Sequence, residues 1–175
     1  MNHFRREYIY VIIIIITVFV IGAVIAATKP GLEIIYSKEI LILEASEYII
    51  EVPEGSIQVG STHYDEIVKL FPEGHILGRS TIYSPDNLDC LFTFTKKENI
   101  LNKVHITTDT IKTARGIQVG DPLDAVIKAY GPDYSWVYEK KNPQDFDMVY
   151  GHDNNNSIVF QIRDNIVSKI VLQKG

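Results

Sequence analysis

The sequence contains a single cysteine, Cys90, among 175 residues. One cysteine cannot form an intramolecular disulfide bond or a multi-cysteine metal site, so a hydrophobic core has to stabilise the fold. Cys90 precedes an apolar run at 91–94. Free cysteines in such surroundings are commonly buried. The sequence therefore predicts an inert, buried thiol.

Basic residues are in the minority, with 17 Lys and Arg against 22 Asp and Glu, which gives a formal net charge of −5 at pH 7. Nucleic-acid binding depends on neutralising phosphates with basic side chains. The charge balance therefore excludes nucleic acid as a partner. It is the balance of a solubilising surface on a globular protein.

Motifs of known chemistry are also missing. The sequence has no nucleophile-elbow motif, no phosphate-binding glycine loop and no dinucleotide-binding fingerprint. None of the five histidines has metal-ligand spacing. Segment 153–164 resembles part of a calcium loop but lacks its glycine and its closing glutamate. Asp145 and Asp147 are predicted to share a solvated strand edge. We therefore expect no catalytic residue, no metal site, no cofactor and no enzymatic activity.

An uncharged apolar run occupies residues 8–27. As a helix it would span about 30 Å, the thickness of a hydrocarbon core. Arg5 and Arg6 precede the run and Lys29 follows it, which places the N-terminus in the cytoplasm. The sequence thus predicts a cytoplasmic tip and transmembrane signal anchor at 1–31, with the membrane as a partner. Residues 32–175 would lie outside the cell membrane.

A cleaved signal peptide is the alternative interpretation of this run. Val24, Ile25 and Ala26 form an acceptable cleavage site, but the run exceeds the usual apolar region of about 7–15 residues. No cysteine follows the run closely, so the chain is not a lipoprotein. In both interpretations the main domain is exported, and in the second it is secreted.

Residues 32–54 are predicted to form a membrane-proximal segment. β-branched residues favour strands at 34–36, 40–43 and 48–52. A helix over 38–46 is the alternative. Pro53, Glu54 and Gly55 indicate a turn, after which two related stretches begin.

The second of these stretches, 116–131, has the pattern of a turn followed by one short amphipathic helix. Asp121 is predicted to cap the helix, and Pro122 suits its first position. Gly131 ends it. The apolar residues have helical spacing: Leu123, Val126, Ile127 and Tyr130.

The first stretch, 56–71, is a degenerate copy. Ile57 to Gly60 repeats the Ile-Gln-Val-Gly sequence of 117–120. Thr62 is predicted to cap the helix, with Asp65 completing an imperfect capping box. The apolar residues again have helical spacing: Tyr64, Ile67, Val68 and Phe71.

Strand patterns follow each helix. Turn residues separate them, and the predicted strands are 81–83, 90–96, 100–107, 134–139, 146–150, 158–163 and 166–173. We therefore predict an α+β fold: an N-terminal transmembrane helix, then two tandem repeats, each of a short helix plus an antiparallel β-meander. Repeat 1 would span 55–107, a linker 108–115, and repeat 2 116–175.

This pattern resembles the β-lactamase-inhibitory-protein-like fold. That group includes small outer-membrane assembly lipoproteins and uncharacterised exported bacterial proteins. The resemblance covers about 55–173. It rests on the Ile-Gln-Val-Gly-Asp sequence at 117–121, a short helix ending in Tyr130-Gly131, and the closing hairpin 158–170. It implies a non-enzymatic module that binds other proteins, commonly through the sheet face turned away from the helices. A predicted anchor and the missing lipidation cysteine set the chain apart from the lipoproteins.

Strand alternation assigns side chains to two faces of the predicted sheet. The face toward the helices is predicted to hold the core: Phe92, Phe94, Ile100, Val104, Ile106, Tyr134, Trp136, Tyr138, Phe146, Met148, Tyr150, Ile158, Phe160, Ile162, Ile166, Ile170 and Leu172. Leu101, Val167 and Val171 are assigned to the other face. For the aromatic set at 134–138, a ligand platform is the alternative.

The face away from the helices is mixed and locally basic. We hypothesise that it meets a partner through five residues: Lys103, His105, Gln161, Arg163 and Lys169. A solvated face without any ligand is the alternative.

Together these features predict a membrane-anchored extracytoplasmic protein-interaction module: a scaffold, inhibitor or sensor of a cell-envelope protein. The first alternative is a small-ligand or peptide binder that uses a groove between the repeats. A cell-envelope hydrolase is a distant alternative.

Overall fold

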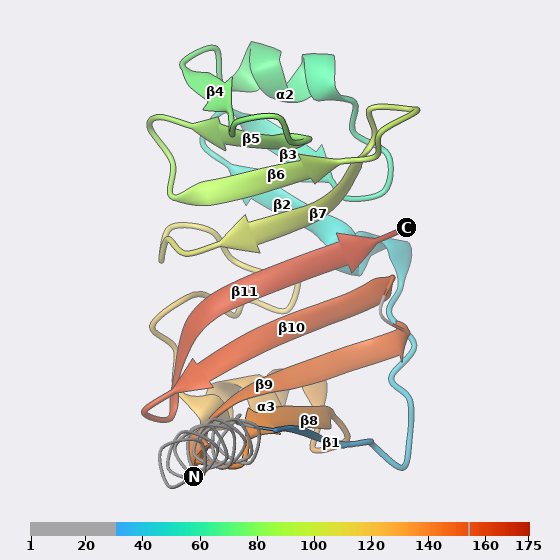
Figure 1. The fold of residues 1–175 in the computed structure, drawn as a ribbon, viewed down its shortest axis with the longest axis vertical. Coiled ribbons are helices and arrows are strands. Elements are labelled where there is room, and N and C mark those ends of the chain that lie inside the picture. Colours follow the sequence, from blue (N-terminus) through green and yellow to red (C-terminus); the bar gives the residue numbers. More distant parts are fainter. Residues whose placement is uncertain (1–30, 154) are drawn as a thin grey trace, which may run out of the picture. The chain divides into compact units, whose positions relative to one another are not determined.

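A nine-stranded antiparallel sheet dominates the computed structural model, which describes residues 31–153 and 155–175 (Figure 1). Residues 32–175 form one compact unit. The strand order across the sheet is β1-β8-β9-β10-β11-β7-β6-β5-β4. The N-terminal half of the chain supplies the sheet strands β1 Leu32–Ile35, β4 Gly74–Ile76, β5 Ile82–Pro85, β6 Cys90–Phe94 and β7 Leu101–Ile106. The C-terminal half of the chain supplies β8 Ser135–Glu139, β9 Asn142–Asp153, β10 Asn156–Arg163 and β11 Ile166–Lys174.

The remaining described elements cover one face of this sheet. They are the 3-10 helix η1 Ala45–Tyr48, the hairpin of β2 Ile49–Val52 and β3 Gly55–Gln58, and the helices α2 Tyr64–Leu70 and α3 Leu123–Tyr130. In Figure 1, α3 and the β2–β3 hairpin lie behind the sheet. No described helix or strand covers the nearer face, which we call the open face.

The two predicted meanders join into one sheet. β7 pairs with β11 in antiparallel register, with Ile106 opposite Ile170 and Val104 opposite Leu172. β1, from the predicted membrane-proximal segment, adds to the edge of β8. An unpaired strand edge exposes backbone donors and acceptors. The pairing of β7 with β11 satisfies the edges that these two strands would expose if the meanders were separate.

The predicted fold class is therefore wrong. The described chain is mostly β, with two short α-helices against a large continuous sheet, and it is not a pair of separate helix-plus-meander repeats behind a transmembrane helix. Local periodicity identifies strands, but it carries no information on whether the last strand of one segment pairs with the last strand of another.

The predicted membrane helix falls on residues 1–30, which lie outside the described residues. Within 31–153 and 155–175, no helix is long and apolar enough to cross a bilayer. The longer α-helix there has 8 residues, whereas a span needs about 20. We therefore correct the prediction of a single-pass membrane protein that has the membrane as a partner.

Both predicted amphipathic helices form, but the residues predicted to cap them bond to the preceding turns instead. Pro122 is the N-cap residue of α3, and no side chain caps that helix. The Asp121 carboxylate instead accepts a hydrogen bond from the backbone N–H of Gln118 at 2.9 Å. Gly131 follows α3 at a φ of 94° and a ψ of 171°, a conformation that strongly favours glycine.

The turn before α2 has the same arrangement. The Thr62 hydroxyl accepts a hydrogen bond from the backbone N–H of Gln58 at 2.9 Å. At the helix start, Glu66 rather than Asp65 accepts from the backbone N–H of His63, at 3.1 Å. Thr62 and Asp121 therefore close a turn, and each turn delivers the chain into its helix.

Each turn is also tied to a strand by equivalent backbone bonds. Gly60 N–H donates to the Leu101 carbonyl at 2.7 Å, and Gly120 N–H donates to the Val167 carbonyl at 2.8 Å. The two glycines have φ values of 93° and 94°, which side chains with a Cβ rarely adopt. The two related stretches thus share local geometry within one sheet.

The core lies between the sheet and the elements behind it. Phe71 stacks on Phe92 with ring centroids 5.6 Å apart, and Tyr130 lies 5.0 Å from Phe160. Most predicted core residues are buried. The aromatic set at 134–138 packs against this core as partly buried side chains, which favours the core interpretation over a ligand platform.

Two β-bulges explain the errors in face assignment. The register shifts between Thr93 and Phe94 and between Gln161 and Ile162. The extra residues are Asn102 on β7 and Ser168 on β11, and each one interrupts the period-two alternation, so that the residues before it lie on the face opposite to the one predicted. Leu101 and Val167 are consequently fully buried, whereas Ile166 is 45% exposed.

Segment 32–54 is only partly as predicted. β1 and β2 form, but no strand forms at 40–43 and no α-helix at 38–46. Leu41 and Leu43 pack against the core. Glu47 in η1 is 7% exposed and is held by Arg115, whose guanidinium donates to its carboxylate at 2.9 Å. The short strands β3 and β4 were not predicted.

Candidate functional site

The open face carries all five residues predicted to meet a partner. Lys103 and His105 lie on β7, Gln161 and Arg163 on β10, and Lys169 on β11. Each is partly exposed. Both halves of the chain supply these residues, and the pairing of β7 with β11 brings the two groups together. Their binding role stays a prediction.

A mostly apolar row crosses the middle of this face. Its members are Cα partners on five successive strands, and we call it the central row: Leu91, His105, Val171, Val159 and Val149. All but Val171, which is 9% exposed, are partly exposed. Apart from His105 the row is an apolar strip, and no described helix or strand covers it.

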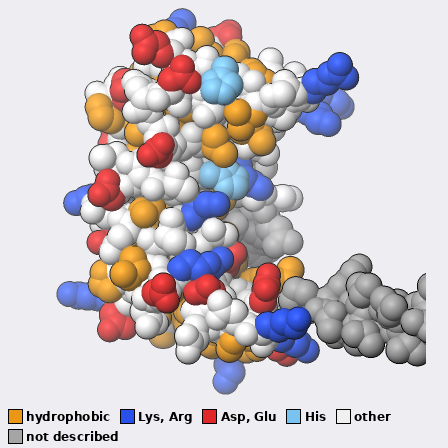
Figure 2. Space-filling model, turned by 60° about the vertical axis from the view of Figure 1, so that its left-hand side comes forward, with side chains coloured by type: hydrophobic (Ala, Val, Ile, Leu, Met, Phe, Trp, Pro, Cys, Tyr) orange, Lys and Arg blue, Asp and Glu red, His pale blue; other side chains and the backbone are white. Residues whose placement is uncertain are grey.

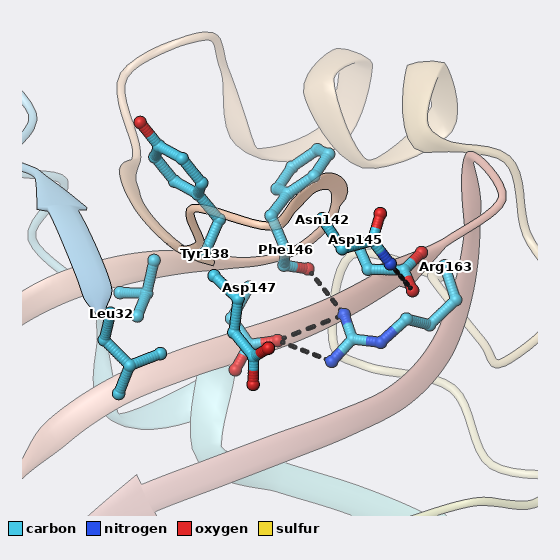
Figure 3. A pocket seen from close by; sticks show the side chains of 9 residues that line it. Leu32, Tyr138, Asn142, Asp145, Phe146, Asp147 and Arg163 are labelled. Atoms are coloured by element: carbon cyan, nitrogen blue, oxygen red, sulfur yellow. Dashed lines mark hydrogen bonds and ion pairs between the residues drawn. The ribbon is translucent and has the colours of Figure 1, made fainter. Parts of the chain in front are cut away.

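Arg163 lies at one end of the face, in a hollow of about 350 Å³ between β1, β8, β9 and β10 (Figure 3). Its guanidinium points toward the Asp147 carboxylate, with nitrogen to oxygen distances of 3.4 Å, and donates to the Phe146 carbonyl at 3.1 Å. Gln161 donates to the same carboxylate at 3.2 Å. Asp147 therefore compensates the charge of Arg163.

This arrangement corrects the prediction for the aspartate pair. β9 lies between β8 and β10, so Asp147 is inside the sheet and not at a solvated edge. Asp145 accepts a hydrogen bond from the Asn142 amide at 2.8 Å. Sequence alternation placed Asp147 on a strand face, but only the pairing of β9 with β10 brings it to Gln161 and Arg163.

Lys103, His105 and Lys169 form a second group near mid-sheet, and basic side chains are visible near mid-height in Figure 2. His105 and Lys169 line a hollow of about 290 Å³ between β5, β6, β7 and β11. The pKa of His105 is lowered from its ordinary value, first by burial of the imidazole and then by the positive charges of Lys103 and Lys169. Lys103 lies two residues before His105 on β7, so its side chain is on the same face of the sheet.

Cys90 is also among the residues that line this hollow, although its side chain belongs to the core. The residue is 4% exposed, and burial is the main cause that raises its pKa to about 12. A thiol with such a pKa is almost fully protonated at neutral pH and is a poor nucleophile. The predicted burial of Cys90 is confirmed, and the raised pKa is in line with an inert thiol.

Within 31–153 and 155–175, no group of three or more His, Cys, Asp or Glu side chains is placed to hold a metal ion. His75 pairs with Asp86 at 3.2 Å, but both side chains are more than half exposed. His3, His152 and Asn154 have no described side chains. The described residues thus offer no cluster of candidate metal ligands.

Comparisons with known proteins give a likeness of fold. No family model and no curated protein matches the sequence. A crystal structure of an extracellular protein containing an SCP domain, from Bacillus anthracis str. Ames, is similar with a TM-score of 0.50 and 8% identity over 80% of this chain. This chain spans 50% of that chain. At this identity the likeness concerns the fold alone.

Proposed function

We propose that this protein is an extracytoplasmic protein-interaction module that binds its partner on the open face. The central row carries the proposal. Four of its five side chains are apolar, and they cross five strands without cover from any described helix or strand. Interaction surfaces commonly combine an apolar centre with a polar rim.

The surroundings of the central row supply such a rim. Lys103, Lys169, Gln161 and Asp147 lie beside it on the same face. The sheet gives these groups fixed spacing, since neighbouring strands are about 4.8 Å apart. A scaffold, an inhibitor or a sensor of an envelope protein is compatible with a rigid face of this kind.

The extracytoplasmic location is part of the proposal. The uncharged run at 8–27, interpreted as a cleaved export signal, supports it. The similar fold of an extracellular protein is in line with it. The resemblance to β-lactamase-inhibitory-protein-like modules, which bind through the face away from the helices, also favours the open face.

A photo-crosslinking side chain at Val159, in the middle of the central row, tests this proposal. We expect it to capture one defined extracytoplasmic protein in intact cells. The same group at Lys128, exposed on α3 behind the sheet, is the control and should capture none of that protein. Val159→Glu should abolish the interaction while leaving the melting temperature within a few degrees, because Val159 is partly exposed. Equal capture from both positions would contradict binding by the open face.

A peptide binder is the second candidate. The hollow bordered by His105 and Lys169 favours it, because β7 and β11 bring the two halves of the chain together there. The hydrolase alternative has no supporting observation among the described residues.

A further inference from the structure

Three basic groups at the centre of the open face have no acidic partner among the described residues. Neither Lys103 nor Lys169 makes an ion pair with any described carboxylate, and the His105 ring has no described hydrogen-bond partner. Arg115 and Arg163 differ, since Glu47 and Asp147 hold them. Positive charge is thus left uncompensated at one place on a protein of net charge −5.

At the Cα partner positions of His105, the strands on either side supply no counter-charge for the two lysines. On β6 its Cα partner is Leu91, and on β11 it is Val171, both apolar. Lys103 on its own strand and Lys169 on β11 are the charged groups that act on its pKa. Asp89 lines the adjoining hollow, but it forms no ion pair with these basic groups in the described part of the chain.

An apolar recess adjoins the basic groups. Pro85, Leu88 and Leu91 line the hollow together with His105 and Lys169. Its volume of about 290 Å³ lies just below the range of about 300–1,000 Å³ for small-molecule pockets. The recess therefore suits one apolar side chain of a longer partner better than a complete small ligand.

We propose that Lys103, His105 and Lys169 bind a carboxylate of an extended, acidic segment of the partner protein, with an adjacent apolar side chain of that segment in the hollow. This inference rests on the proposed function and specifies the partner's chemistry. Charge complementarity carries it, because the partner carboxylate supplies the counter-charge that the described chain lacks at this place.

Binding of a carboxylate here is linked to proton uptake. The free His105 has a lowered pKa because of burial and the two lysines. A carboxylate beside the ring favours the imidazolium and raises that pKa. The affinity for the carboxylate therefore increases as the pH falls from above the pKa of His105 in the complex toward the lower pKa of His105 in the free protein. Each unit of pKa rise corresponds to at most about a tenfold gain in affinity.

Two fluorescent peptides test the inference on the full chain. One alternates glutamate and leucine, and the matched one alternates glutamine and leucine. From fluorescence anisotropy we expect the glutamate peptide to bind about tenfold more tightly. Lys169→Glu should remove this preference, whereas Lys128→Glu, the same charge change behind the sheet, should change affinity less than about twofold. The affinity of the glutamate peptide should rise between about pH 8 and about pH 6 in the wild type, and this rise should be lost in His105→Gln.

The outcomes separate this inference from the proposed function. Equal binding of the two peptides, both blocked by Val159→Glu, would overturn the carboxylate site and leave the open-face proposal standing. Binding of neither peptide, or a glutamate preference that survives Lys169→Glu, would also overturn the carboxylate site. The Val159 crosslink decides the open-face proposal independently of these peptides.

Discussion

At the scale of single residues, two arginines show how distant segments are held together. Arg163 bonds Asp147 across neighbouring strands of the open face. Arg115 lies between α3 and η1, where it donates to Glu47 and to the Ala129 carbonyl and lies 4.7 Å from the centre of the Tyr130 ring. The Glu47 side chain is largely buried and needs such a partner, because an unpaired charge out of water is costly.

Arg115→Ala should destabilise the fold by about 3 kcal/mol, because the variant leaves Glu47 buried without its counter-charge. Arg115→Lys should lower the free energy of unfolding by less, since lysine keeps the positive charge. It should still lower it, because lysine lacks the paired geometry of the guanidinium. Urea unfolding measures both changes. A third variant, Glu47→Gln with Arg115→Ala, should recover part of the loss. If Arg115→Ala costs no more than an exposed substitution such as Lys128→Ala, the pair has no stabilising role.

At the scale of elements, the related stretches before α2 and α3 each combine a turn, a glycine and a short helix. Their polar side chains close the turn, while the backbone of the glycine bonds a sheet strand. These contacts place one helix against each half of the sheet. The predicted helices were therefore correct, although the predicted function of Thr62 and Asp121 as helix caps was wrong.

Asp121→Ala should destabilise the chain by about 1 kcal/mol, because the N–H of Gln118 loses its acceptor. Asp121→Asn is the matched variant, since its amide oxygen can accept the same hydrogen bond. Thermal unfolding followed by circular dichroism measures the two. Equal losses in Ala and Asn would show that the carboxylate charge, rather than the hydrogen bond, stabilises the turn.

At the scale of the whole described unit, the pairing of β7 with β11 makes one sheet from two segments. Ile170 is fully buried at this seam and has Cα partners on both β7 and β10. The same seam brings His105 close to Lys169. The candidate carboxylate site therefore exists because the halves join, and no part of either half contains it alone.

Ile170→Ala should cost about 2–5 kcal/mol through lost burial and a cavity at the seam. Because the core is continuous, amide exchange should accelerate together in β5 and β6 and in β8 and β9. Hydrogen-exchange mass spectrometry measures this. Val149→Ala, partly exposed on the open face, is the control, with a loss of about 1 kcal/mol. Faster exchange on one side of the seam only would mean that the halves unfold separately.

The sequence by itself determined the features that depend on local order along the chain. Apolar spacing located α2, α3 and most strands, alternation identified the core around Phe92 and Phe160, and the run around Cys90 predicted a buried thiol. It also placed Lys103, His105 and Lys169 on one face, because residues two apart in a strand point the same way.

Only the tertiary structure decided how these pieces meet. The bulges that bury Leu101 and Val167 arise from pairing with other strands, and the bond between Arg163 and Asp147 depends on which strands are neighbours. The joining of β7 to β11 replaced the predicted repeats with one sheet. Strand partners, register shifts and charge compensation are interactions between distant residues. Periodicity within a single segment cannot specify them.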